Sequence, residues 1–131
     1  MRNPEIEAVF KECADLCDTK NDDYASKDDF YKNFRLVEQI AVPMWVGVFI
    51  RFLDKFSRLT GFVSRYIKTG KMEVKHESIE DTFKDGINYL AIALVCYRNW
   101  KTTTSFKITD TDNNDVNRSS IFNHYKNLQN D

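Results

Sequence analysis

Met44–Lys68 reads MWVGVFIRFLDKFSRLTGFVSRYIK, and this stretch decides the fold. Its apolar side chains fall on most sides of a helix, which is typical of a buried helix at the centre of a bundle. The charged side chains share one narrow arc at about 100° per residue, and this arc holds Arg51, Asp54, Lys55, Arg58 and Arg65. The sequence therefore predicts a central helix with one polar row. Such long apolar helices are buried either inside one bundle or across a symmetric interface.

Shorter helices are expected before this stretch. Asn3-Pro4-Glu5 predicts a helix start, because Asn caps free N–H groups and Pro suits the first helical position. Apolar residues then recur at helical steps as far as Cys17, so the helix is expected to end near Thr19. Turn formers follow at Lys20–Tyr24. A capping box at Ser26 and Asp29 predicts a short second helix, which carries Phe30, Phe34, Val37 and Ile40.

The chain after the central stretch predicts one further long helix. Gly70 is suited to end the central helix, and residues 72–76 form a loop or a short strand. A second capping box, Ser78–Asp81, predicts a helix that ends near Trp100. Residues 101–131 form a polar tail, in which 120–128 could make a last short helix. We therefore expect a compact all-α bundle of four to five helices at 1–100, followed by this tail.

Composition excludes several classes of protein. The 131 residues suit a single domain, and nineteen basic against twenty acidic residues leave no positive field for bulk nucleic-acid binding. The longest apolar run, Ile40–Leu53, is interrupted by Pro43 and Arg51 and is too short to span a membrane. Three cysteines, an odd number without metal-site spacing, indicate buried thiols in a reducing cytoplasm. We expect no membrane partner.

Four polar residues form a row on one side of the last long helix: Glu77, Asp81, Asp85 and Asn88. Acids four residues apart place their oxygens close enough to share Mg²⁺. Acids in a first helical turn also complement the helix dipole without any metal, and capping alone explains Asp81. Asp85 favours the metal site, because it lies beyond the first turn and no cation follows at 88 or 89.

The polar row of the central helix also permits two interpretations. Arg51, Lys55 and Arg58 could bind phosphate oxygens, since Arg offers a bidentate fork and Lys a point charge. Asp54 could instead join the two arginines in an internal ladder of ion pairs. If the two polar rows face each other, they form a cleft with carboxylates on one wall and cations on the other, as a metal-bound polyphosphate requires.

Four segments of the chain resemble one family of proteins. They are Lys20–Tyr24 (KNDDY), Phe30–Arg35 (FYKNFR), Gly47–Leu59 (GVFIRFLDKFSRL) and Glu77–Tyr89 (ESIEDTFKDGINY). They look like the nucleotide-modification-associated domain of bacteriophages, which is similar to MazG-like all-α nucleoside triphosphate pyrophosphohydrolases. The resemblance implies a dimer or tetramer in the cytoplasm, or in the host cytoplasm for a viral protein, that binds a nucleotide with Mg²⁺.

The resemblance also implies roles for particular residues. Asp81 and Asp85 would be catalytic, and the metal ligands would be Asp54, Glu77, Asp81 and Asp85. The nucleotide and its phosphates would be bound by Lys20, Tyr24, Arg51, Lys55, Arg58 and Asn88. Arg51 stands where the family's ExxE motif has its first glutamate, so one metal ligand is lost. The chain is therefore expected to be a pyrophosphohydrolase, a non-catalytic nucleotide-binding protein, or a helical interaction module.

Overall fold

A computed structural model describes residues 1–24, 28–72 and 75–107, with side chains at all of these except 23, 24, 76, 77 and 102–107. The described chain forms three α-helices and one 3₁₀-helix and contains no strand. They are α1 (Pro4–Tyr24), η1 (Arg35–Ile40), α2 (Met44–Thr69) and α3 (His76–Lys107). The expected all-α fold is confirmed.

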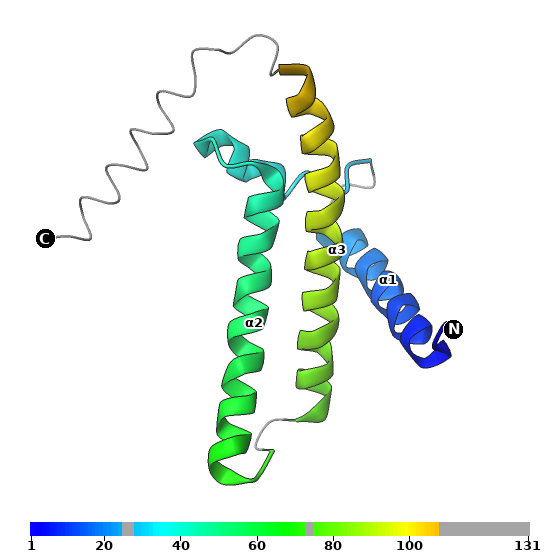
Figure 1. Ribbon diagram of the computed structural model, residues 1–131, viewed down its shortest axis with the longest axis vertical. Helices are drawn as coiled ribbons and strands as arrows, with labels where there is room; N and C mark the ends of the chain where they lie inside the picture. Colours follow the sequence, from blue (N-terminus) through cyan, green and yellow to red (C-terminus); the bar gives the residue numbers. More distant parts are fainter. Residues whose placement is uncertain (25–27, 73–74, 108–131) are drawn as a thin grey trace, which may run out of the picture. The chain divides into compact units, whose positions relative to one another are not determined.

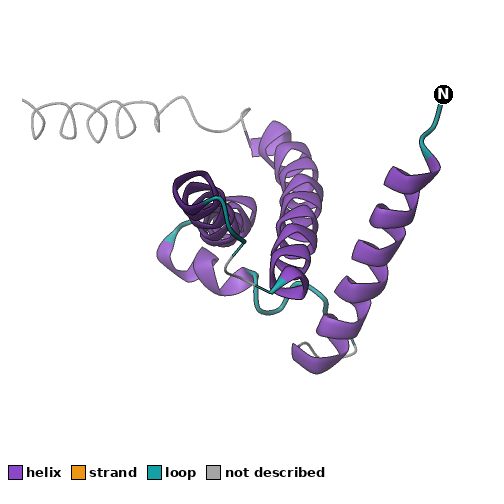
Figure 2. Ribbon diagram, turned by 90° about the horizontal axis from the view of Figure 1, so that it is seen from below, coloured by secondary structure: helices purple, strands orange, loops and turns teal. Residues whose placement is uncertain are grey.

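The helices α2 and α3 lie side by side and run in opposite directions (Figures 1 and 2). Near one end, the Trp45 and Tyr97 rings meet edge to face with centroids 5.4 Å apart. Near the other end, Arg58 donates a hydrogen bond to the Ser78 hydroxyl at 2.9 Å. Part of the polar row of α2, at Lys55 and Arg58, therefore faces α3. The predicted bounds of α2 are confirmed.

The helix α1 lies on the side of α3 away from α2 (Figures 1 and 2). Its start is as predicted, because the Asn3 side chain accepts hydrogen bonds from the N–H groups of Glu5 and Ile6 at 2.9 and 3.3 Å. The predicted end near Thr19 is wrong, since the helix continues through Lys20–Tyr24. That segment holds neither Gly nor Pro, and an ion pair between Lys20 and Asp85 holds it against α3.

The segment between α1 and α2 is less helical than predicted. Among its described residues, 28–43, only η1 is helical, and Asp29 accepts a hydrogen bond from the Tyr31 N–H at 3.1 Å and pairs with Arg35. The proposed cap at Ser26 lies outside the described residues. Gly47 lets η1 pack closely on α2, because a Cβ there would lie 2.7 Å from a methyl carbon of Val37.

The ends of the two long helices differ in how well local sequence predicts them. Gly70 ends α2 as predicted, with φ of 67° and its N–H bonded to the Tyr66 carbonyl at 2.8 Å. The predicted cap at Ser78 is wrong, because α3 already begins at His76. The described residues at 72 and 75 are not in a strand. The helix α3 continues past Trp100 to Lys107, and the expectations for 108–131 lie outside the described residues.

The chain divides into two units, Met1–Arg98 and Asn99–Asp131, and the contacts between α1, α2 and α3 given above lie within the first. The buried apolar residues of the described chain are few: Cys13, Val48, Phe62, Ala93 and Cys96. The expectation that α2 is buried on most sides is wrong for the single chain, because Phe49, Leu53 and Phe56 are exposed. Among the described elements, α3 and the short η1 contact α2, and they leave these three side chains uncovered. No described helix has the length and apolar character that crossing a membrane requires.

Candidate functional site

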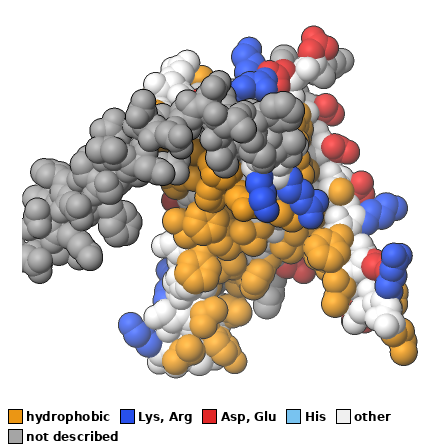
Figure 3. Space-filling view, turned by 45° about the horizontal axis from the view of Figure 1, so that its top comes forward, with side chains coloured by type: hydrophobic (Ala, Val, Ile, Leu, Met, Phe, Trp, Pro, Cys, Tyr) orange, Lys and Arg blue, Asp and Glu red, His pale blue; other side chains and the backbone are white. Residues whose placement is uncertain are grey.

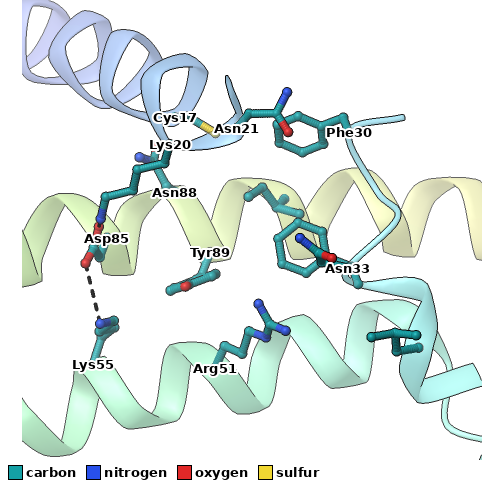
Figure 4. Close-up of a pocket in the computed structure, with 13 residues that line it drawn as sticks. Cys17, Lys20, Asn21, Phe30, Asn33, Arg51, Lys55, Asp85, Asn88 and Tyr89 are labelled. Carbon is teal, nitrogen blue, oxygen red and sulfur yellow. Dashed lines mark hydrogen bonds and ion pairs between the residues drawn. The ribbon is translucent and has the colours of Figure 1, made fainter. Parts of the chain in front are cut away.

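One cavity of about 500 Å³ opens between α1, α2, α3 and the segment that precedes η1 (Figure 4). Five side chains predicted from the sequence as site residues line it: Lys20, Arg51, Lys55, Asp85 and Asn88. They come from three different helices and are separated by as many as 68 positions along the chain. The fold thus brings together members of the two polar rows and Lys20, which was selected through the family resemblance.

Asp85 is the residue on which the three helices converge. Its carboxylate pairs with Lys20 from α1 through one oxygen and with Lys55 from α2, at 3.4 Å, through the other. In Figure 4 it lies between the two lysine side chains. Only 15% of the Asp85 side chain is exposed, so water screens these pairs less than it would at the surface. The carboxylate therefore holds two cations at the cavity wall.

Arg51 is the third cation of the cavity. It extends from α2 towards the cavity (Figure 4), and its guanidinium lies over the Phe34 ring, 5.0 Å from the centroid. This cation–π contact places the guanidinium beside the Phe34 ring without using a carboxylate. Asp54 forms no ion pair with Arg51 or Arg58 among the described residues, so the internal ladder is absent there.

Other predicted site residues lie elsewhere. Arg58 does not line the cavity, because its guanidinium donates to Ser78 and packs 5.7 Å from the Phe62 ring centroid. Asp54 and Asp81 are exposed and also lie outside the cavity lining. The side chains of Tyr24 and Glu77 are outside the described residues. The two polar rows therefore meet only over part of their length.

The metal-ligand prediction receives no support from the side chains that the structure describes. Among them, no three His, Cys, Asp or Glu groups are close enough to hold a metal ion together. Asp85 is the only described carboxylate that lines the cavity, and lysines contact both of its oxygens. A Mg²⁺ site built with Asp54, Glu77 or Asp81 stays a prediction.

Asn88 has a structural contact as well as a place in the lining. Its amide donates a hydrogen bond to the backbone carbonyl of Cys13 at 2.9 Å, which ties α1 to α3. Close by, Lys84 pairs with Glu12 at 3.0 Å, and this hydrogen bond raises the pKa of the lysine. Asn88 therefore helps to hold α1, the helix that carries Lys20, against α3.

Some lining residues were not selected from the sequence as site residues. They supply aromatic, amide and thiol groups: Cys17, Asn21, Phe30, Asn33, Phe34 and Tyr89. Tyr89 lies four residues after Asp85 on the same side of α3, and helical spacing could have identified it. Phe30 and Asn33 come from an irregular segment whose path no periodicity predicts. Burial raises the pKa of the Cys17 thiol, and Asp18 raises it further.

The cavity combines three cations and one carboxylate with aromatic rings and amide groups. This set can bind an anionic group at Lys20, Arg51 and Lys55 and pack a flat ring system beside it. Its described lining contains a thiol, Cys17, but no serine, threonine or histidine. Comparisons with protein-family models, with curated proteins and with solved structures give no match to this chain.

Proposed function

We propose that this chain binds a nucleotide in the cavity between α1, α2 and α3. One observation carries the proposal: Arg51 and Lys55, Asp85 and Asn88, from two polar rows in the sequence, line the same cavity as Lys20, which the family resemblance selected. Its volume of about 500 Å³ is in the range of small-molecule sites. The net charge of its described lining is positive, which suits a phosphate ester.

The phosphates bind at the cation end of the cavity. Lys20 and Lys55 already hold a carboxylate, so their ammonium groups are placed around one anion. Arg51 adds a bidentate donor that lies beside the Phe34 ring. The base packs among Phe30, Phe34 and Tyr89, in a lining that also contains the amide groups of Asn21 and Asn33.

A second candidate is Mg²⁺-dependent hydrolysis of a (deoxy)nucleoside triphosphate to monophosphate and pyrophosphate, as the MazG-like resemblance implies. Asp85 favours it, because a bound phosphate would compete for Lys20 and Lys55 and free carboxylate oxygens for a metal. Such a metal would activate water and neutralise charge on the phosphates. The MazG-like bundle, the phage origin and the homo-oligomer stay predictions of the resemblance.

The experiment measures binding and pyrophosphate release in parallel, using a panel of ribo- and deoxyribonucleoside triphosphates with Mg²⁺ and with chelator. Binding without release identifies a nucleotide-binding protein, and metal-dependent release identifies the pyrophosphohydrolase. Absence of both would contradict the proposal and favour a helical interaction module.

Lys55→Ala tests the location of the site. The variant loses one charge-assisted phosphate contact, for which about 1.5–3 kcal/mol is typical, so its affinity should fall at least tenfold. Lys68→Ala is the matched control, because this lysine lies on the same helix outside the cavity lining. Equal weakening in both variants would show that the nucleotide is bound by general charge rather than at the cavity.

A further inference from the structure

The helix α2 carries a regular row of side chains on the face opposite its cavity residues. The row, called the outer row here, consists of Phe49, Leu53, Phe56, Thr60, Val63 and Ile67. Its successive spacings of four, three, four, three and four residues are those of a helix that pairs with another helix. The five apolar members are 40, 44, 53, 54 and 75% exposed in chain order. The residues that the structure describes leave this row uncovered.

The residues beside the outer row are all uncharged: Ile50, Phe52, Ser57, Leu59, Ser64 and Tyr66. The charges of this stretch of α2 lie on the other side, and Arg51 and Lys55 among them line the cavity. A second helix could therefore approach the outer row without bringing like charges together. The cavity would stay open, because it is on the opposite side of α2. Figure 3 shows hydrophobic side chains gathered in a broad patch on one face of the molecule.

The sizes of the outer-row side chains suit antiparallel pairing of the row with a second copy of itself. Its first half, Phe49, Leu53 and Phe56, is bulky, and its second half, Thr60, Val63 and Ile67, is smaller. Antiparallel pairing about a point midway between Phe56 and Thr60 places each bulky residue opposite a smaller one. Parallel pairing would instead place Phe opposite Phe and Thr opposite Thr. The pattern thus fits a second copy of the same chain, related by a two-fold axis.

We infer that two copies of this chain associate through their outer rows, with the two α2 helices antiparallel. An aromatic side chain at this exposure leaves on the order of 100 Å² in water. At about this area for each side chain, the five apolar members together with Ile50 and Tyr66, which are 53 and 51% exposed, leave roughly 700 Å², which approaches the ~800 Å² per partner that stable interfaces bury. The paired length from Phe49 to Ile67 is about 27 Å at 1.5 Å per residue.

A second apolar row, on α3, provides the natural alternative surface. It includes Phe83, Leu90 and Leu94, which are exposed. Phe10 of α1 lines a common groove with Leu90 and Leu94, so α1 covers part of this row. Its flank also carries the charged pair Lys84–Glu12. The outer row of α2 has neither feature, and we therefore assign the contact to α2.

Sedimentation equilibrium of the full chain tests the choice of surface. Phe56→Glu places a charge in the outer row and should convert the dimer to a monomer. Phe83→Glu is the matched control, because both rings are 53% exposed and both stand on long helices. It should leave the dimer intact, and circular dichroism checks the helix content of both variants. A monomeric wild-type chain, or a dimer broken only by Phe83→Glu, would overturn the inference.

Disulfide trapping tests the orientation. Phe49→Cys and Ile67→Cys are expressed separately, mixed and oxidised, with the wild-type chain as control for Cys13, Cys17 and Cys96. Antiparallel pairing brings position 49 of one copy beside position 67 of the other, within the Cα separation of a disulfide. The mixture should therefore form the mixed dimer, and neither variant should crosslink alone. Crosslinking of Phe49→Cys with itself would indicate parallel helices and contradict the inference.

Discussion

The contacts of Asp85 distinguish two roles that a carboxylate can have in an anion-binding cavity: ligand of a metal ion, or ion-pair partner of the cations. The sequence favoured it as a metal ligand, whereas the folded chain gives it Lys20 and Lys55 as partners. In the nucleotide-binding proposal the carboxylate occupies the place of a phosphate until the ligand arrives. It is then a competitor for the two lysines.

Asp85→Asn should therefore bind a nucleotide more tightly than the wild-type chain when chelator removes all metal. Because Lys20 is half exposed, the gain is about two- to fivefold, corresponding to ~0.5–1 kcal/mol for a partly exposed ion pair. Titration calorimetry of both chains measures it. Any Mg²⁺-dependent pyrophosphate release should be lost in the same variant. Weaker binding in chelator would show that the carboxylate itself supports the ligand.

Cys17 offers a chemical reporter of the cavity. Cys13 and Cys96 are 2% exposed, whereas Cys17 is half-buried and lines the cavity. Since burial raises the pKa of its thiol, less thiolate is present at pH 8 than in a free cysteine. Alkylation of Cys17 should thus be slow at pH 8, accelerate above pH 9 and become slower still with bound nucleotide.

Mass spectrometry of the alkylated peptide gives the rate for each cysteine. Cys17→Ser serves as the control, and its folded chain should remain unmodified over the same period. Equal rates for Cys17 with and without a saturating nucleotide would place the nucleotide outside this cavity.

At the scale of elements, the sequence correctly predicted those helix ends that depend on interactions between neighbouring residues. The Asn3 cap, the bounds of α2 and the Gly70 terminus depend on groups within four residues, and the sequence contains them. Ser78 is not a cap because α3 already begins at His76, and its hydroxyl accepts a hydrogen bond from Arg58 of another helix. The continuation of α1 through Lys20 likewise depends on Asp85, a contact that no sequence window contains.

The candidate site could likewise be predicted only in those parts that depend on spacing within one helix. Helical spacing placed Arg51 and Lys55 on one face of α2, and Asp85 and Asn88 on one face of α3. Their convergence with Lys20 follows from helix packing, which spacing alone does not give. Arg58 had the right phase but lies nearer the end of α2, beside Ser78, where the cavity has already ended.

Two glycines of α2 provide a matched pair of substitutions. Gly61→Ala should stabilise the chain by about 0.5–1 kcal/mol, because an added Cβ meets nothing within 4 Å and Ala favours a helix. Gly47→Ala gains the same propensity, but its Cβ would lie 2.7 Å from a Val37 methyl carbon of η1. Its net effect should be a loss of about 1–3 kcal/mol.

Urea unfolding followed by circular dichroism measures both glycine variants under identical conditions. Stabilisation by Gly47→Ala would show that η1 does not pack on α2 as described. Loss of stability in Gly61→Ala would show that a neighbour outside the single chain approaches this glycine.

At the scale of the whole molecule, the cavity and the outer row of α2 use opposite faces of one helix. The described buried core is small, and large apolar side chains remain exposed along α2. The sequence left open whether such a helix is buried within a bundle or across a symmetric interface. The exposed outer row favours the interface, and association there would fix α2 while leaving Arg51 and Lys55 free to bind a ligand.

Thermal unfolding should therefore depend on the concentration of the chain. If folding and association are coupled, each tenfold rise in concentration stabilises the dimer by ~1.4 kcal/mol, which raises the Tm by roughly 2–5 °C. Circular dichroism over a hundredfold range of concentration measures the shift. The monomeric Phe56→Glu chain should melt at one lower temperature throughout, because it has no association to lose. A wild-type Tm that stays constant over this range would mean that α2 is stable with its outer row in water.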